Sequence, residues 1–312
     1  MNIKQLEKLL KTKTAKEIFG EDKDKVFRDL SFICHPDRTG NADIFLLLNK
    51  KFDELIEKKT VITSKKRSYS IAAVFAEGDR STLYMTDNMI LKITRSPKTK
   101  LTAEREFVKA TYNDTESPKL HHYYDNLIDS FTLPDGRSCD VFPIDPDLVG
   151  LEQLKEKFPN GIDPKHIAWI FKRILSGVGF AHKVGFLHCG ILPSHILICP
   201  KDHGALFVGL NNAMKIGEKM TSISPKYENM YPPEVLKKEE QDKSLDIYMA
   251  AKTCIWLLGD RLGEERKLKI FLEGLTLPNP KRRIDDAWGV HWHWDELLRK
   301  VFGEPKFQKL EV

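Results

Sequence analysis

The chain of 312 residues contains 41% hydrophobic and 30% charged residues, which excludes collagen-like, coiled-coil and largely disordered chains and predicts two globular domains. Its net charge of +5 comes from the N-terminal fifth, since residues 1–67 hold 16 of the 50 basic residues but only 11 of the 45 acidic ones. The longest nearly uncharged stretch, residues 167–199, is interrupted by three basic residues, so no segment is predicted to span a membrane.

The N-terminal residues carry no readable secretory signal. Met1 to Leu10 alternates charged and apolar residues and therefore lacks both a continuous apolar core and a small-residue cleavage site. The five cysteines are widely spaced and include no Cys-x-x-Cys pair, which argues against a disulfide framework and against a zinc site. We therefore expect a cytoplasmic protein with free thiols.

Three helices are predicted before residue 60, because apolar residues recur at helical spacing in three segments: 3–10, 26–33 and 45–55. Between the second and third segments, Pro36 and the Gly40-Asn41 pair favour a turn. The sequence therefore predicts an all-helical domain at residues 1–60 whose second and third helices form an antiparallel hairpin. A polar, basic linker at residues 61–67 follows.

Strands are predicted next, where short apolar runs are separated by turn residues: 69–76, 81–85, 89–94, 127–133 and 138–143. A helix at residues 99–112 interrupts this series. From Leu151 the pattern becomes mostly helical, and the nearly all-apolar segment 167–181 predicts a long buried helix. The chain after the linker is therefore predicted to be a small sheet with one helix, followed by a helical lobe.

The loop of the predicted helical hairpin reads His35-Pro36-Asp37. It lies between a helix that carries Phe27-Arg28-x-Leu30 and a helix that carries Phe45-x-x-x-Asn49-x-x-Phe52-x-x-Leu55, and Glu17-Ile18-Phe19-Gly20 precedes both. This combination resembles a J-domain, the DnaJ-type module that stimulates the ATPase of a DnaK-type chaperone.

The resemblance implies a chaperone-binding surface that consists of His35, Pro36, Asp37, Lys25, Arg28 and Arg38. Pro36 would fix an exposed turn that presents the Asp37 carboxylate, which suits a basic group on the partner. The second helix ends with residues 31–34, Ser-Phe-Ile-Cys, where the family has further basic residues. The alternative interpretation is that the tripeptide is only a turn after a helix.

Residues 68–312 contain a second ordered series of motifs. In chain order these are Leu91-Lys92-Ile93, Arg105-Glu106-Phe107, Phe180-Ala181-His182, Gly185-Phe186-Leu187-His188, Tyr231-Pro232-Pro233-Glu234, Asp246-Ile247-Tyr248 and Asn279-Pro280-Lys281-Arg282-Arg283. The series resembles a protein kinase domain over nearly its whole length. It implies a two-lobed α+β fold with the smaller lobe at residues 68–145 and the larger lobe at residues 146–312.

The kinase resemblance also implies structural roles for several polar residues. Glu234 and Arg283 would form a buried ion pair, and Asp246 would brace the backbone of the catalytic loop. Lys92 and Glu106 would form either a surviving nucleotide contact or an ion pair that holds a helix in place. We favour the structural ion pair for them, because the magnesium ligands are missing.

The residues that transfer phosphate in a kinase are absent from their expected places. Counting from His188 puts Gly190 at the catalytic aspartate and His195 at the metal-binding asparagine. The same spacing puts Val208 at the metal-binding aspartate. Without these oxygen ligands Mg²⁺ has nothing hard to bind, so we expect a catalytically inactive kinase fold, a pseudokinase.

Other ligands are not indicated by the sequence. Glu77 and Asp79 lie in the loop that would cover the phosphates of a nucleotide, and their charges would repel it. No three histidine, cysteine or acidic residues have the close spacing of a metal site. The run Lys65-Lys66-Arg67 is interpreted as a solvated linker, because no recognition module for nucleic acid is visible. We therefore expect no cofactor, metal, nucleic-acid or membrane partner.

The sequence predicts a co-chaperone-like adaptor. Its pseudokinase would bind an unidentified client protein or complex, and its J-domain would bring a DnaK-type chaperone to that client and trigger ATP hydrolysis. The alternative is an atypical enzyme that binds ATP through Lys92 and uses non-standard catalytic residues. A third interpretation, that a virus or mobile element uses the J-domain to subvert a host chaperone, rests only on the divergence of both modules.

Overall fold

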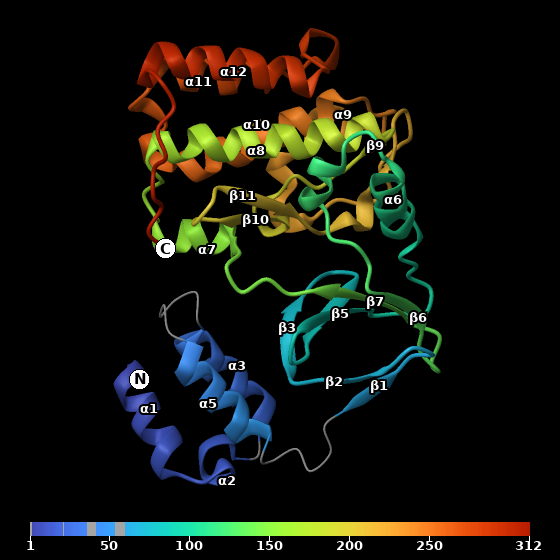
Figure 1. Cartoon of the computed structure of the whole chain (residues 1–312), viewed down its shortest axis with the longest axis vertical. Coiled ribbons are helices and arrows are strands. Elements are labelled where there is room, and N and C mark those ends of the chain that lie inside the picture. The colour runs from blue at the N-terminus through green and yellow to red at the C-terminus, as the bar shows by residue number, and fades with distance from the viewer. Residues whose placement is uncertain (1, 21, 36–41, 54–59) are drawn as a thin grey trace. The chain divides into compact units, whose positions relative to one another are not determined.

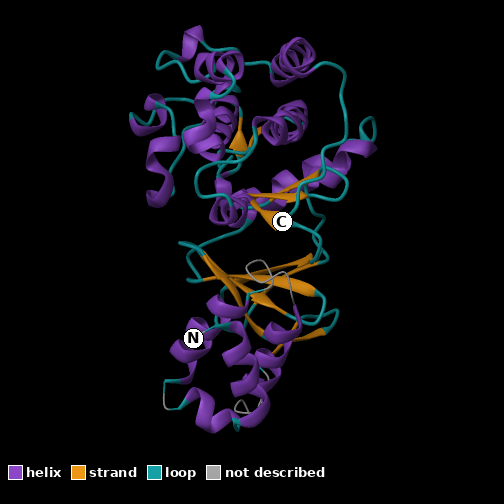
Figure 2. Cartoon of the chain, turned by 90° about the vertical axis from the view of Figure 1, so that its left-hand side faces the viewer, coloured by secondary structure: helices purple, strands orange, loops and turns teal. Residues whose placement is uncertain are grey.

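The computed structural model describes residues 2–20, 22–35, 42–53 and 60–312 of the chain. The chain divides into two compact units. The first unit comprises Met1–Thr99, Ile128–Ile144 and Val312, and the second comprises Lys100–Leu127 and Asp145–Glu311. The first unit contains a group of helices and a curved sheet, whereas the second is mainly helical (Figures 1 and 2). No helix among the described residues is long and apolar enough to cross a membrane.

The chain begins with a group of short helices: α1 (Ile3–Thr12), α2 (Ala15–Phe19), α3 (Lys23–Cys34) and α5 (Ala42–Asp53). Reciprocal side-chain to backbone hydrogen bonds cap two of them, between Asn2 and Gln5 at α1 and between Thr14 and Glu17 at α2. The bonds from Thr14 also lower the pKa of the Glu17 carboxyl to about 2. The predicted first helix is therefore followed by a separate helix, α2. It begins at Ala15, directly after the capping residue Thr14.

The helices enclose their own hydrophobic core, in which Leu6, Leu10 and Leu48 are completely buried. The rings of Phe27, near the start of α3, and Phe52, near the end of α5, stack with their centres 4.1 Å apart. Since the start of one helix meets the end of the other, α3 and α5 are antiparallel, as the sequence predicts. The predicted core residue Leu55 lies outside the described residues.

A five-stranded antiparallel sheet follows, in the order β3 (Ala73–Glu77), β4 (Ser81–Met85), β5 (Met89–Thr94), β7 (Ser138–Pro143) and β6 (Asp129–Thr132). Four of these strands lie within segments that the sequence predicts to be strands, and β3 extends one residue beyond its predicted segment, to Glu77. The central strand β5 has five of its six residues buried, which explains its nearly uninterrupted apolar sequence.

The predicted linker at residues 61–67 is folded in the structure. It contains β1 (Val61–Thr63), which pairs antiparallel with β2 (Ser68–Ser70). The Ser64 side chain forms the turn, since its hydroxyl accepts hydrogen bonds from the backbone N–H groups of Lys66 and Arg67. The predicted strand 69–76 is accordingly divided between β2, which pairs with β1, and β3, which pairs with β4.

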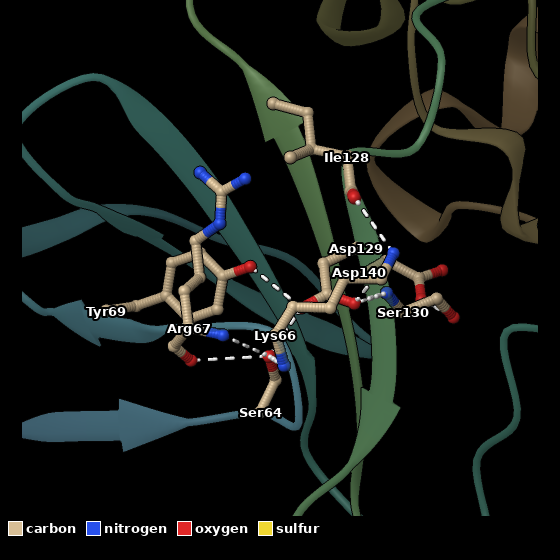
Figure 3. Close-up of polar contacts among 8 residues, drawn as sticks. All are labelled: Ser64, Lys66, Arg67, Tyr69, Ile128, Asp129, Ser130 and Asp140. Atoms are coloured by element: carbon tan, nitrogen blue, oxygen red, sulfur yellow. Dashed lines mark hydrogen bonds and ion pairs between the residues drawn. The ribbon is translucent and has the colours of Figure 1, made fainter.

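A buried carboxylate anchors this hairpin to the sheet (Figure 3). The Asp129 side chain on β6 is 5% exposed and accepts hydrogen bonds from the hydroxyls of Ser64 at 2.6 Å and Tyr69 at 2.8 Å. The Lys66 ammonium lies 3.5 Å from the same carboxylate. Burial raises the pKa of Asp129, but these hydrogen bonds outweigh it and hold the pKa below its usual value. Burial and the neighbouring carboxylate raise the pKa of Tyr69 to about 12.

The helices of the second unit are α6 (Thr102–Asn113), α7 (Leu151–Lys157), α8 (Pro164–Lys183), α9 (Pro233–Leu236), α10 (Ser244–Leu258), α11 (Arg266–Gly274) and α12 (Ala287–Phe302). The long buried helix that the sequence predicts is α8, whose residues are almost all inaccessible between Ile174 and His182. Its packing against α10 and α12 makes it the centre of the main hydrophobic core.

Short strands and single turns complete the second unit. Three strands form a small antiparallel sheet in the order β11 (Gly204–Phe207), β10 (Ile196–Cys199) and β8 (Val149–Gly150), and β9 (Phe186–Leu187) pairs with β12 (Met214–Lys215). The 3₁₀ turns are η1 (Pro118–Tyr123), η2 (Pro193–His195), η3 (Leu210–Asn212), η4 (Pro225–Met230), η5 (Gly259–Gly263) and η6 (Pro280–Arg282). These short elements position the loops that follow α8.

The Asp129 anchor predicts a specific cost when the carboxylate is removed. Asp129→Ala leaves the buried Tyr69 hydroxyl without its acceptor, so the free energy of unfolding measured by urea denaturation should fall by about 1–3 kcal/mol. Asp135→Ala is the matched control, because this exposed carboxylate lies in the β6–β7 turn of the same sheet and its loss should cost about 0.5 kcal/mol or less. Equal losses in the two variants would show that the anchor contributes nothing specific.

Candidate functional site

The loop after β9 is held by one buried carboxylate from α10. Asp246 is completely buried and accepts hydrogen bonds from the backbone N–H groups of His188 and Cys189, both at 2.8 Å. The Nε2 atom of His182, on α8, lies 3.1 Å from the same carboxylate. Burial raises the pKa of Asp246, but the hydrogen bond from His182 and the nearby N–H groups outweigh it and hold the pKa below its usual value. The brace that the sequence analysis assigns to Asp246 is present.

The backbone turns sharply where it meets Asp246. Cys189 has a φ of 59°, a left-handed conformation that costs a non-glycine residue about 1–2 kcal/mol. This turn redirects the chain directly after the second N–H group that donates to Asp246. Further along the loop, the hydroxyl of Thr253 donates a hydrogen bond of 2.7 Å to the carbonyl oxygen of Ile191. The loop is therefore fixed to α10 at both ends.

The structure brings together Gly190, His195 and Val208, the three residues that the sequence analysis assigns to the places of a kinase's base and metal ligands. The ring Nδ1 of His195 lies 3.0 Å from the carbonyl oxygen of Gly190, and the backbone N–H of Val208 donates to the carbonyl oxygen of His195 at 2.9 Å. Gly209, with a φ of 76°, makes room for the imidazole, since a Cβ atom there would lie 2.4 Å from the ring. The His195 ring therefore packs between two glycine backbones.

These residues offer little chemistry for phosphate transfer. Gly190 and Val208 carry no side-chain oxygen or nitrogen, and the His195 ring already faces a backbone carbonyl. In the ranges that the structure describes, no group of three histidine, cysteine or acidic side chains gathers as metal ligands would. The arrangement supplies neither a carboxylate base nor paired oxygen ligands for Mg²⁺.

His188 lies in the core of the second unit, not in solvent. Its ring is completely buried, with the ring centres of Phe207, Tyr124 and Phe107 at 5.8, 6.3 and 6.4 Å. Burial lowers the pKa of His188 to about 4, so the imidazole is neutral at pH 7. Its place among aromatic rings identifies it as a packing residue.

A buried charge also lies within the sheet of the first unit. Lys92 on β5 is 5% exposed, and the strand register places it directly opposite Asp140 on β7, which is completely buried. Directly opposed residues have their Cβ atoms about 4.5–5.5 Å apart on the same face of a sheet. The Ser130 hydroxyl donates a hydrogen bond of 2.9 Å to the Asp140 carboxylate. Lys92 therefore faces an acidic residue of its own sheet, which the sequence analysis missed.

The buried glutamate of α6 is not the predicted one. Glu106 is exposed, whereas Glu104 is 2% exposed. Helical spacing explains the difference, because Glu104 shares its face with the buried residues Phe107, Val108 and Thr111. The assignment of Glu106 as the inward-facing carboxylate is therefore wrong. The sequence does hold a signal for Glu104, because Phe107, Val108 and Thr111 follow it at helical spacing.

Two further polar clusters hold the second unit. The Arg283 guanidinium contacts the Glu234 carboxylate, both are buried, and the Arg283 guanidinium lies 5.2 Å from the centre of the Tyr248 ring. This is the ion pair that the sequence analysis expects. The second cluster was not predicted: Glu152 on α7 accepts close contacts from the Lys226 ammonium and the Tyr227 hydroxyl of η4. Burial and the Glu152 carboxylate raise the pKa of Tyr227.

The N-terminal helices present the second candidate surface. Lys25 and Arg28 are exposed on α3, and Phe32, one turn after Arg28, is 61% exposed. His35 ends the helix, and its ring meets the Phe45 ring edge-on with the ring centres 5.3 Å apart. The remaining predicted residues of this surface, Pro36, Asp37 and Arg38, lie outside the described residues.

Comparison with known proteins identifies the fold of most of the chain. The BubR1 kinase domain is similar with a TM-score of 0.62 and 12% identity, covering 82% of this chain and 92% of that structure. Vaccinia related kinase 3 is similar with a TM-score of 0.58 and 12% identity, covering 78% of this chain and 91% of that one. The PknI kinase domain of Mycobacterium tuberculosis has a TM-score of 0.55 and 15% identity, covering 75% and 97%. No family model matches the sequence, and no curated protein does.

At these identities the likeness establishes a protein-kinase-like α+β fold with additional N-terminal helices. The structure thus agrees with the predicted fold class at this level.

The opposed charges in the sheet predict an asymmetric response to mutation. Asp140→Asn leaves the buried Lys92 ammonium opposite a neutral side chain, which should lower the free energy of unfolding by about 1–3 kcal/mol. The double variant Lys92→Met and Asp140→Leu removes both charges and should recover most of this loss.

Asp79→Asn, at an exposed turn of the same sheet, is the control and should change the stability by about 0.5 kcal/mol or less. Urea denaturation measures all three effects. If Asp140→Asn and Asp79→Asn change the free energy of unfolding equally, then Asp140 does not stabilise the buried Lys92 ammonium.

Proposed function

We propose that the protein is a co-chaperone-like adaptor that uses an N-terminal J-domain to recruit a DnaK-type chaperone and stimulate its ATPase. The kinase-like fold would act as an inactive scaffold that binds a client protein or complex. The observation that carries this proposal is the exposed basic face of α3, with Lys25 and Arg28 leading to His35 at the start of the His-Pro-Asp loop.

The architecture of the helices supports the first half of the proposal. The antiparallel pair α3 and α5 shares a hydrophobic core with α1 and α2, so the two helices that flank the His-Pro-Asp loop are held by a folded support. Basic groups on α3 beside the Asp37 carboxylate would give a surface of mixed charge, which suits a partner with both acidic and basic groups. The exposed Phe32 adds an apolar contact where the J-domain family has further basic residues.

The chemistry of the kinase-like fold supports the second half. Gly190, His195 and Val208 provide no carboxylate base and no pair of oxygen ligands for Mg²⁺, whereas Asp246 and the Glu234–Arg283 pair hold the unit together. A kinase-like fold that keeps these structural contacts and lacks the catalytic groups can still bind another protein. We therefore propose that it is a pseudokinase.

The test is single-turnover ATP hydrolysis by a DnaK-type chaperone from the same cell or host, with and without the full-length protein. Asp37→Asn keeps the size of the side chain and removes its charge, so it should abolish the stimulation without lowering the melting temperature. Arg28→Glu should weaken the stimulation about tenfold and make it less dependent on salt, because it removes a screened electrostatic attraction.

Lys8→Glu is the matched control, since Lys8 is exposed on α1 of the same group of helices. It makes the same charge change away from α3 and should leave the stimulation unchanged. If the wild-type protein stimulates no such chaperone, or if Lys8→Glu and Arg28→Glu are equally impaired, the proposed recruitment surface is wrong.

A further inference from the structure

The segment after α12 lies along the surface of the second unit without regular structure. α12 ends at Phe302, Gly303 follows with a φ of 79°, and Glu304 contacts Arg299 of the helix at 2.6 Å. Residues 303–309 are all exposed and form neither helix nor strand. Figure 1 shows this segment leaving α12 and running along the side of the lobe toward the end where α7 lies. It is attached to the unit at a few points only.

The first attachment is a stack of three rings. The His203 ring lies flat against Trp169, with the ring centres 4.0 Å apart and the planes within 2°. Phe307 of the terminal segment stacks on His203 at 4.3 Å, with an angle of 18° between the planes. The His203 Nε2 also makes a 2.8 Å hydrogen bond with the carbonyl oxygen of Gln308, which fixes the direction of the segment.

The surface beneath the segment is rigidly built. His203 occupies the turn between β10 and β11 with a φ of 60°, and the Arg173 Nε donates a hydrogen bond of 2.7 Å to its carbonyl oxygen. The Trp169 indole and the Arg173 side chain both come from α8, the central helix of the unit. The His203 backbone and the Trp169 ring are therefore held by the body of the unit, and only the His203 ring contacts the terminal segment directly.

The second attachment is Leu310. It is 4% exposed and belongs to the main hydrophobic core, whereas the side chains of its neighbours Lys309 and Glu311 are 76% and 81% exposed. Phe307 and Leu310 are thus the two anchors of an otherwise solvated segment. These two side chains, three positions apart, make the apolar contacts of the segment with the unit.

We propose that residues 303–311 form a detachable strap, and that the surface beneath it is a docking site for an extended partner segment with an aromatic-x-x-Leu pattern. The strap occupies this site in the free protein. A partner segment with the same two anchors replaces it by competition, so that the concentration of the partner sets the fraction of open sites. This inference does not depend on the chaperone role proposed above.

The test uses the full chain and a fluorescent peptide with the sequence of residues 303–311. The double variant Phe307→Ala and Leu310→Ala releases the strap. Fluorescence anisotropy should show saturable binding of the peptide to this variant and binding at least about tenfold weaker to the wild type, whose own strap competes at a high effective concentration. A peptide with alanine at both anchor positions should not bind.

Lys309→Ala is the matched control, because the Lys309 side chain points into solvent between the two anchors. This variant should bind the peptide as weakly as the wild type. Equal binding to the wild type and the double variant would overturn the proposal, as would no binding to a double variant that keeps its circular dichroism spectrum. Loss of the folded state in the double variant would also overturn it, since the segment would then be part of the core and not a strap.

Discussion

The second unit depends on the hydrogen bonds of one buried carboxylate. Asp246 joins α10 to α8 through His182 and to the loop after β9 through two backbone N–H groups. An ionised carboxylate without partners would be very costly in the interior, so these donors are needed for the unit to fold. The left-handed turn at Cys189 comes directly after the second of these N–H donors.

The same constraint explains how the kinase-like fold can tolerate the proposed loss of kinase chemistry. None of the atoms that bind Asp246 belongs to the side chains that would transfer phosphate, since the loop is held through its backbone. Gly190 and His195 can therefore occupy the catalytic places while the loop keeps its path. The Glu234–Arg283 pair likewise joins distant parts of the unit without touching those places. Structural and catalytic requirements are carried by different residues, which supports the proposed role as a binding scaffold.

The periodic spacing of apolar residues was enough to predict the main helices, but contacts between residues far apart in the chain could not be predicted from the sequence. Helical spacing identified the core of α3 and α5 and the buried α8, and motif order located Asp246. The same motif order misplaced Glu106, because the buried face of α6 is fixed by packing and selects Glu104. The first strand and the turn of the hairpin lie in residues 61–67, which the sequence predicts to be a linker. Sequence patterns missed them because the anchor that stabilises the hairpin, Asp129, lies about sixty residues further along the chain. The position of Asp140 opposite Lys92 follows from the register of β5 and β7, which the sequence alone does not give.

Titration of the full-length protein with ATP by isothermal calorimetry tests most directly whether the kinase-like fold is a scaffold without catalytic chemistry. The measurement is made with and without Mg²⁺, and Lys92→Met serves as the reference. We expect no binding, or weak binding that Mg²⁺ does not strengthen, because Gly190, His195 and Val208 offer the metal no pair of oxygen ligands. In addition, Lys92 faces Asp140 of its own sheet. A micromolar dissociation constant that tightens with Mg²⁺ and is lost in Lys92→Met would contradict the account and favour an atypical ATP-binding enzyme.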